Sequence, residues 1–256
     1  MTPLSEHSLL ASYETTYYEQ MPLSVIFPQT SLINLNLDLI TDKISKDLMI
    51  CGLHGLVTVD LLIFEGKNMK EQLFWTHDLR LALTDFISTF SFFTCLMKDG
   101  EFDPLNKRFL LNKDETLSED FWKKRIERSF YFINDMKFEG IKEVELRKFF
   151  EFCKGSDICF DFERREGSVF VLENELEKGR FGVIFIEEKK DGITKKIINI
   201  LLSIKKRFQK GAEKKREYGE LEYFVERLRK GTKLIWKKWD FWNFYRELKN
   251  NFEIFR

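Results

Sequence analysis

Apolar residues recur at two different spacings along this chain, and each spacing predicts a different kind of secondary structure. Steps of three and four residues place apolar side chains on one face of a helix. Such steps occur at Leu37, Ile40 and Ile44, and Gly52 is placed to end that helix. On this basis we predict helices over residues 37–51, 79–97, 118–135, 144–153, 191–208, 221–228 and 234–256.

Strict alternation of apolar and other residues, or a short apolar run between glycines, predicts strands instead. Ile158, Phe160 and Phe162 follow such an alternation, and a turn at residues 165–167 separates them from the next apolar run. Residues 101–113 are predicted to be a connection. We predict strands over residues 56–64, 72–75, 158–162, 168–172 and 179–186, and an edge strand or an ordered arm over 24–27.

These elements together predict an α+β fold, with small antiparallel sheets packed against helices and a helical, basic C-terminal third. The chain has 256 residues, of which 43% are hydrophobic, so it is long enough to bury a core. We predict an N-terminal α+β region at residues 1–113, a central helix plus antiparallel meander at 114–188, and a basic aromatic region at 189–256.

The central unit resembles a known bacterial family. Gly140 precedes a short amphipathic helix at 146–150, then come the predicted strand at 158–162, a glycine turn at Gly167 and the pair Phe181-Gly182. In this order the segment 138–186 resembles the PATAN family of response-regulator-associated domains. The resemblance implies a non-catalytic module for protein–protein signalling.

Charge is unevenly distributed, although 42 basic residues balance 42 acidic ones. Residues 189–256 carry 20 Lys and Arg against 9 Asp and Glu, a net charge of +11, so the preceding residues carry −11. Cations interleaved with aromatic rings can neutralise phosphates and stack on bases. The candidate nucleic-acid-binding residues are Lys205, Lys206, Arg207, Lys210, Lys214, Lys215, Arg216, Trp236, Lys237, Lys238 and Trp239.

The same C-terminal pattern is compatible with three other roles. Aromatic residues at helical spacing are typical of core packing, here including docking on the acidic body of the same chain. A membrane-surface helix or a contact with a partner helix is also compatible with the pattern. These alternatives remain open at the level of sequence.

Catalytic chemistry is poorly supported by the sequence. We predict no catalytic residue, no cofactor and no metal site, because His54 and His77 lack a recognisable partner and no phosphate-binding glycine loop precedes a helix. Asp161, Glu163, Glu173 and Glu175 are an alternative Mg²⁺ site, but the polar face of a solvated sheet explains them more simply. The four cysteines are expected to be reduced and buried.

The sequence therefore favours a non-enzymatic protein-interaction or signalling adaptor in the cytoplasm, without a transmembrane segment. The alternative is a nucleic-acid-binding protein, or a subunit of a nucleic-acid-processing complex, that uses the basic aromatic C-terminal region. A homo-oligomer is compatible with either interpretation.

Overall fold

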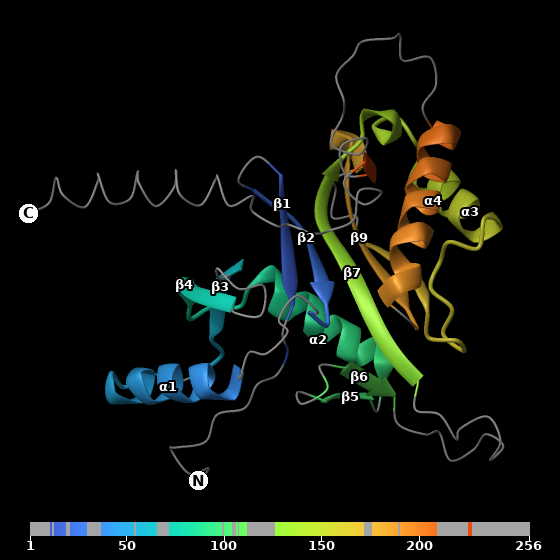
Figure 1. Ribbon diagram of the computed structural model, residues 1–256. Coiled ribbons are helices and arrows are strands. Elements are labelled where there is room, and N and C mark those ends of the chain that lie inside the picture. The colour runs from blue at the N-terminus through green and yellow to red at the C-terminus, as the bar shows by residue number, and fades with distance from the viewer. Residues whose placement is uncertain are drawn as a thin grey trace, which may run out of the picture.

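The computed structural model describes residues 11, 13–18, 21–29, 37–53, 55–65, 72–98, 100–103, 106, 108–111, 126–171, 176–188, 190–208 and 225–226. These residues form an α+β fold, which confirms the predicted class (Figure 1). Neighbouring strands are antiparallel throughout the main sheet. A second sheet contains two strands and is also antiparallel.

The main sheet has seven strands and is built around β7 (Ile126–Lys137), which pairs with β2, β6 and β9. Residues on both sides of position 113 contribute to this sheet. The other strands are β1 (Glu14–Tyr18), β2 (Met21–Phe27), β5 (Gly100–Asp103), β6 (Arg108–Leu111), β8 (Gly167–Val171) and β9 (Arg180–Glu187).

The two central strands of the main sheet, β7 and β9, are buried on both faces. Because successive side chains of a strand point to opposite faces, Phe130 and Phe132 of β7 join one hydrophobic cluster, whereas Tyr131 and Ile133 join another. The hydroxyl of Tyr131 lies 2.7 Å from the Ser24 hydroxyl, so the ring is buried with its polar end hydrogen-bonded. The sheet therefore separates two cores.

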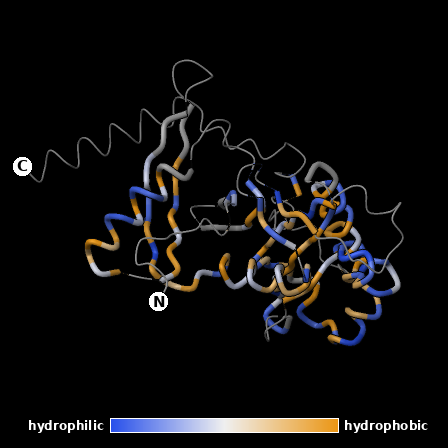
Figure 2. Tube along the Cα trace, turned by 90° about the horizontal axis from the view of Figure 1, so that it is seen from below, coloured by the Kyte–Doolittle hydropathy of each residue, from blue (hydrophilic) through white to orange (hydrophobic). Residues whose placement is uncertain are grey.

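Helices cover these two faces. One core contains apolar side chains of α2 (Asp85–Met97), and the other contains those of α3 (Leu146–Gly155) and α4 (Lys190–Phe208). Figure 2 shows apolar positions distributed along the strands and helices that form this body. Short 3₁₀ helices lie at η1 (Glu139–Ile141) and η2 (Leu176–Lys178).

A smaller unit extends from this body and consists of α1 (Leu37–Ile50), β3 (Thr58–Glu65) and β4 (Gln72–Arg80); we call it the outer unit (Figure 1). Gly52 ends α1 with a φ of 72°, where the amides of Gly52 and Leu53 bond back to Met49 and Leu48. This Schellman arrangement satisfies the last carbonyls of the helix and favours glycine. None of the side chains described at residues 40–50 is buried.

Several predicted elements are confirmed with small shifts in their ends. The helix predicted at 37–51 is α1, the helix at 144–153 is α3, and the helix at 191–208 is α4. On α4, Ile197, Leu201 and Ile204 are fully buried, as the predicted stripe requires. The strands predicted at 56–64, 168–172 and 179–186 correspond to β3, β8 and β9.

The helix predicted at 118–135 is wrong. Residues 126–137 form β7, and the part before residue 126 lies outside the described residues. The segment contains a continuous apolar run, Phe130, Tyr131, Phe132 and Ile133. Such a run lacks the alternation of a strand and is equally compatible with helical spacing. The physical reason for the run is that β7 is covered on both faces, so alternation disappears.

Four other predictions need correction. The helix expected from residue 79 begins at Asp85, where the Thr84 hydroxyl accepts a hydrogen bond from the Ile87 amide, because residues 72–80 continue as β4. Residues 158–162 form isolated bridges within a tight loop rather than a strand. Residues 100–103 and 108–111 are strands, not connection, and β2 lies between β1 and β7, so it is not an edge strand.

The C-terminal predictions lie mostly outside the described residues. Of the helix predicted at 221–228, the structure describes Val225, which is buried, and Glu226. The aromatic segment at 234–256 is not among the described residues. No helix among the residues that the structure describes is both long and apolar enough to cross a membrane.

Candidate functional site

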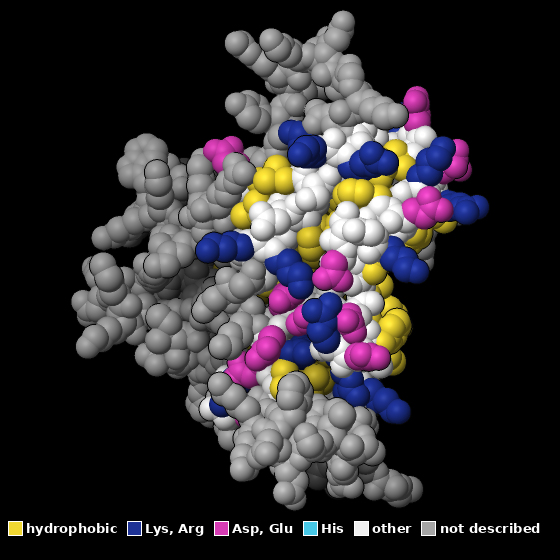
Figure 3. Space-filling view, turned by 90° about the vertical axis from the view of Figure 1, so that its right-hand side faces the viewer, with side chains coloured by type: hydrophobic (Ala, Val, Ile, Leu, Met, Phe, Trp, Pro, Cys, Tyr) yellow, Lys and Arg dark blue, Asp and Glu magenta, His cyan; other side chains and the backbone are white. Residues whose placement is uncertain are grey.

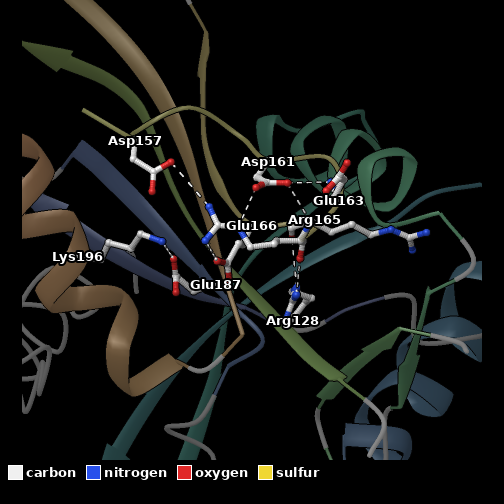
Figure 4. A network of polar contacts seen from close by, with 9 residues as sticks. Arg128, Asp157, Asp161, Glu163, Arg165, Glu166, Glu187 and Lys196 are labelled. Atoms are coloured by element: carbon white, nitrogen blue, oxygen red, sulfur yellow. Dashed lines mark hydrogen bonds and ion pairs between the residues drawn. The ribbon is translucent and has the colours of Figure 1, made fainter. Parts of the chain in front are cut away.

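A tight loop between α3 and β8 is held by several polar contacts; we call residues 157–166 the braced loop (Figure 4). The amides of Asp161 and Glu166 bond to each other's carbonyls, which closes its tip. One carboxylate oxygen of Asp161 accepts the amides of Glu163 and Arg164 at 2.9 and 3.0 Å, and the other accepts Nε of Arg164 at 2.8 Å. The backbone hydrogen bond from Arg164 is the main reason that the pKa of Asp161 is lowered.

Arg128 of β7 holds this loop from below. Its guanidinium group donates to the carbonyl oxygens of Arg164 at 2.6 Å and Arg165 at 3.1 Å, and also to that of Glu127. The side chain is buried, and burial lowers the pKa of the guanidinium, while the carboxylates of Glu166 and Glu188 act in the opposite direction. A buried cation bonded to carbonyl groups fixes the loop backbone against the sheet.

Arg165 connects the loop to a third element. Its guanidinium group donates to the carbonyl oxygens of Met97 and Lys98, at 3.0 and 2.8 Å, at the C-terminal end of α2. A cation at this position satisfies the unpaired carbonyls of a helix end and complements the helix dipole. Arg165 and Asp157 both have positive φ angles, 52° and 53°, which residues other than glycine adopt at a cost in free energy.

The tip of the braced loop carries an exposed aromatic residue. Phe162 is 77% exposed, and its ring stands perpendicular to that of Phe160 at a centroid distance of 5.1 Å. Figure 3 views the side that carries α3 and α4, where basic and acidic side chains alternate and hydrophobic side chains reach the surface between them. The ion pair of Lys196 and Glu187 lies beside the network in Figure 4.

A second charged cluster lies on the β3–β4 hairpin. Asp60 and Asp78 are directly opposite each other across the two strands, an arrangement that is unfavourable for like charges. Arg80 forms ion pairs with both carboxylates, at 3.1 Å for Asp78. Burial alone would lower the pKa of Arg80, but the hydrogen bond and the charge of Asp60 outweigh it, and the pKa is raised. The chain therefore offsets one of these two negative charges with its own cation.

The structure describes only part of the predicted nucleic-acid-binding set. Lys205, Lys206 and Arg207 lie in the last turn of α4, where cations complement the helix dipole. The predicted nucleic-acid contact stays a prediction. The remaining members lie outside the described residues: Lys210, Lys214, Lys215, Arg216, Trp236, Lys237, Lys238 and Trp239.

The alternative metal site at Asp161 and Glu163 is not assembled by the described residues. The Asp161 carboxylate is engaged by Arg164 and by two amides, and Glu173 and Glu175 lie outside the description. Within the described ranges, no group of three or more His, Cys, Asp and Glu side chains is placed to hold a metal ion. His77 lies exposed on β4.

The expectation of four buried thiols is only partly correct. All four cysteines are free, but Cys51 and Cys95 are exposed, Cys159 is half-buried and Cys153 is buried. Burial raises the pKa of the Cys153 thiol to about 12, which makes it a poor nucleophile at neutral pH.

Comparison with known proteins finds a partial match to a different family from the one that the sequence suggested. Residues 1–104 match the model of a family described as IQCH-like, ATP-grasp. The match includes the outer unit and all of α2, and it excludes the braced loop. No curated protein and no solved structure matches the chain.

The resemblance to the PATAN family is therefore wrong. The matching family model lies over a different part of the chain, and nothing supports PATAN over residues 138–186. The geometry agrees with this correction, because the expected first strand of the meander, residues 158–162, is a tight loop. The pattern of Ile158, Phe160 and Phe162 arises in that loop from one buried anchor, one half-buried ring and one exposed ring.

Sequence analysis missed the groups that organise both charged clusters. Arg128 was placed on a helix, and Arg80 lay within the expected helix from residue 79. The signal that was available for the second cluster is the pair Asp60 and Asp78 on neighbouring strands, since facing carboxylates require a cation nearby. The three carbonyl partners of Arg128 belong to the backbone of β7 and of the loop. Contacts to backbone carbonyls leave no pattern in the side-chain sequence from which they could be predicted.

Proposed function

We propose that this chain is a non-enzymatic protein-interaction module and that its outer unit contacts a protein partner. The proposal rests on one observation. The outer unit and the residues flanking it expose several large apolar side chains to solvent. They are Ile50 (84% exposed), Leu53, Leu56, Trp75, Leu81 and Leu83 (73% exposed).

Single exposed apolar residues are common on proteins, but an accumulation of them marks an interaction surface. In the outer unit the apolar face of α1 is at best half-buried, and among the side chains described on β3 and β4 only Thr58 is buried. Covering a side chain such as Ile50 or Leu83 stabilises a complex by about 1.5–3 kcal/mol before the costs of association. Burial of these side chains against a partner would therefore stabilise a complex with the outer unit.

The proposal is tested by affinity purification from cells that naturally contain the protein. The tagged full chain is compared with an Ile50→Ser/Leu83→Ser variant and with a control, Leu146→Ser, which changes a residue that is 52% exposed on α3. We expect a specific protein to be retained by wild type and control and lost by the double variant, with all three showing equal urea midpoints. Recovery of the same proteins by all three would refute the proposal.

The signalling role that accompanied this interpretation rested on the PATAN resemblance, and it is not part of the proposal. A second candidate function comes from the family match, because the description of that family includes ATP-grasp. Arg80, about half exposed between two carboxylates, is the one cation on the described part of the β3–β4 hairpin and is a candidate phosphate contact.

Nucleotide binding is tested by thermal unfolding with ATP, with and without Mg²⁺. A ligand that binds only the folded state at a hundred times its Kd adds about 2.7 kcal/mol of stability. The second candidate predicts a rise in Tm that is lost in Arg80→Ala and kept in Arg108→Ala, a control in another exposed ion pair. An unchanged Tm at millimolar ATP under both conditions removes this candidate.

A further inference from the structure

The braced loop presents Phe162 in a fixed position, and we propose that Phe162 inserts into an apolar pocket rimmed by basic residues on a protein partner. This inference deepens the proposed function and rests on it in one respect, since both require a protein partner. The surface is separate from the outer unit, and the family match does not extend to it.

The loop backbone is held by contacts from three elements. Arg128 of β7 binds the carbonyls of Arg164 and Arg165, and Arg165 binds carbonyls at the end of α2. Ile158, which is 3% exposed, anchors the start of the loop in the core, and its carbonyl accepts the Ser168 amide at 3.0 Å. A loop held this way loses little conformational freedom on binding, which is the advantage of a preorganised contact.

The fold itself gains little from the tip. Phe162 touches Phe160 at the ring edge but remains 77% exposed, so most of the benefit of burying a phenylalanine, about 2 kcal/mol, is not realised. The backbone at the same time adopts two unfavourable φ angles, at Asp157 and Arg165, to reach this shape. Loop tips are ordinarily polar, and a braced tip with an exposed ring has the properties of an interface anchor.

The charges around Phe162 define the chemistry of the partner. The loop contains four carboxylates, Asp157, Asp161, Glu163 and Glu166, against the two guanidinium groups of Arg164 and Arg165. Arg164 is shared among three of these carboxylates, at 2.8 to 3.7 Å, and Arg165 is turned toward α2. Asp157 and Glu163 are exposed in the same loop as Phe162, and four carboxylates against two guanidinium groups give the loop a net charge of −2, which fits a basic rim.

The inference is tested by placing the photo-crosslinking residue p-benzoylphenylalanine at position 162 of the full chain in its native cells. Phe150 is the matched control position, because it is also a phenylalanine with a 41% exposed side chain, on α3. We expect an adduct from position 162 at a yield about ten-fold above position 150, and mass spectrometry locates the attachment point on the partner. The attachment point must lie in an apolar site flanked by Lys or Arg.

Binding of the identified partner is then measured with purified proteins. We expect Phe162→Ala to weaken affinity at least about ten-fold, as a central aromatic anchor does, and Glu163→Lys to weaken it about three-fold with a smaller dependence on salt. Phe150→Ala is expected to bind like wild type. The Ile50→Ser/Leu83→Ser variant of the outer unit is measured in parallel, so that failure of one surface is distinguished from failure of the other.

Four crosslinking results overturn the inference. They are equal crosslinking at positions 162 and 150, attachment in an acidic site, attachment to nucleic acid or lipid, and attachment to a second copy of this chain. Full affinity of Phe162→Ala for the crosslinked partner also overturns it. Loss of binding in the outer-unit variant with normal binding of Phe162→Ala supports the proposed function while rejecting this inference.

Discussion

Replacing Arg128 by methionine should destabilise the protein markedly, because the three hydrogen bonds of this buried guanidinium are lost. Methionine fills a similar space without donors, so the carbonyls of Glu127, Arg164 and Arg165 lose their partner. A hydrogen bond to a charged group contributes about 1.5–3 kcal/mol, and an unsatisfied buried acceptor costs about 1–3 kcal/mol.

These contributions do not simply add. Removing the cation also removes the free energy spent on its burial, which amounts to several kcal/mol for an isolated ion. Part of the loop surface admits water, so the freed carbonyls regain some hydrogen bonding. We therefore expect a net loss of about 2–4 kcal/mol, a large share of the about 5–15 kcal/mol that stabilises a typical domain.

Urea unfolding followed by circular dichroism measures this loss, and Arg108→Met is the matched control. Arg108 forms one ion pair with Glu127 at 2.7 Å, and both side chains are more than 40% exposed, so its removal should cost about 0–1 kcal/mol. Limited trypsin digestion adds a local measurement, because cleavage after Arg164 and Arg165 should accelerate in Arg128→Met only. Equal stabilities of the two variants, with equal cleavage rates, would refute the account of Arg128 as a brace.

Three further predictions use urea unfolding of closely matched variants. Gly167→Ala should destabilise by about 2 kcal/mol or more, because φ is 118° and a Cβ atom would meet the carbonyl oxygen of Cys159, whereas Gly155→Ala, with no atom within 4 Å, should be neutral or slightly stabilising. Phe149→Ala should cost about 3–5 kcal/mol and its exposed neighbour Phe150→Ala less than about 1, and similar losses would contradict the assignment of Phe149 to the core. The pKa of the Asp161 carboxyl is lowered in the folded state, so its stabilising contribution is present above the unfolded pKa and is lost as the pH falls through the folded pKa. Asp161→Asn should therefore be less stable than wild type at pH 6 and equal to it under strongly acidic conditions. A constant difference in stability at all pH values would contradict this linkage.

The parts of the fold that could be predicted from sequence are those with one buried face. The helix α4 has Ile197, Leu201 and Ile204 on its buried face and lysines elsewhere, so the helical period is visible. The strands β3, β8 and β9 were found because glycines or turns bound short apolar runs. In each of these cases local sequence and tertiary environment indicate the same element.

The strand β7 could not be predicted, because its environment removes the period on which prediction depends. Both of its faces are buried from Arg128 to Ile133, and its three pairing partners are distant in sequence. Whether such a run becomes a strand is decided by pairing with β2 and β9, which no local pattern shows. The braced loop could not be predicted for the same reason, because Arg128 bonds to carbonyls that lie 36 and 37 residues away in sequence.

The two proposed surfaces differ in how the fold supports them, and this difference predicts different modes of binding. The outer unit offers apolar area on a helix and a hairpin with few fully buried side chains, so a partner would gain mainly from removing that area from water. The braced loop offers one ring on a backbone fixed by Arg128 and Arg165, with exposed carboxylates in the same loop. A small, rigid and charged contact contributes more to specificity than to buried area. A partner with misplaced charges is penalised, and the loop loses little conformational entropy on binding. Affinity is thus assigned mainly to the outer unit, and specificity to Phe162 and its acidic surroundings.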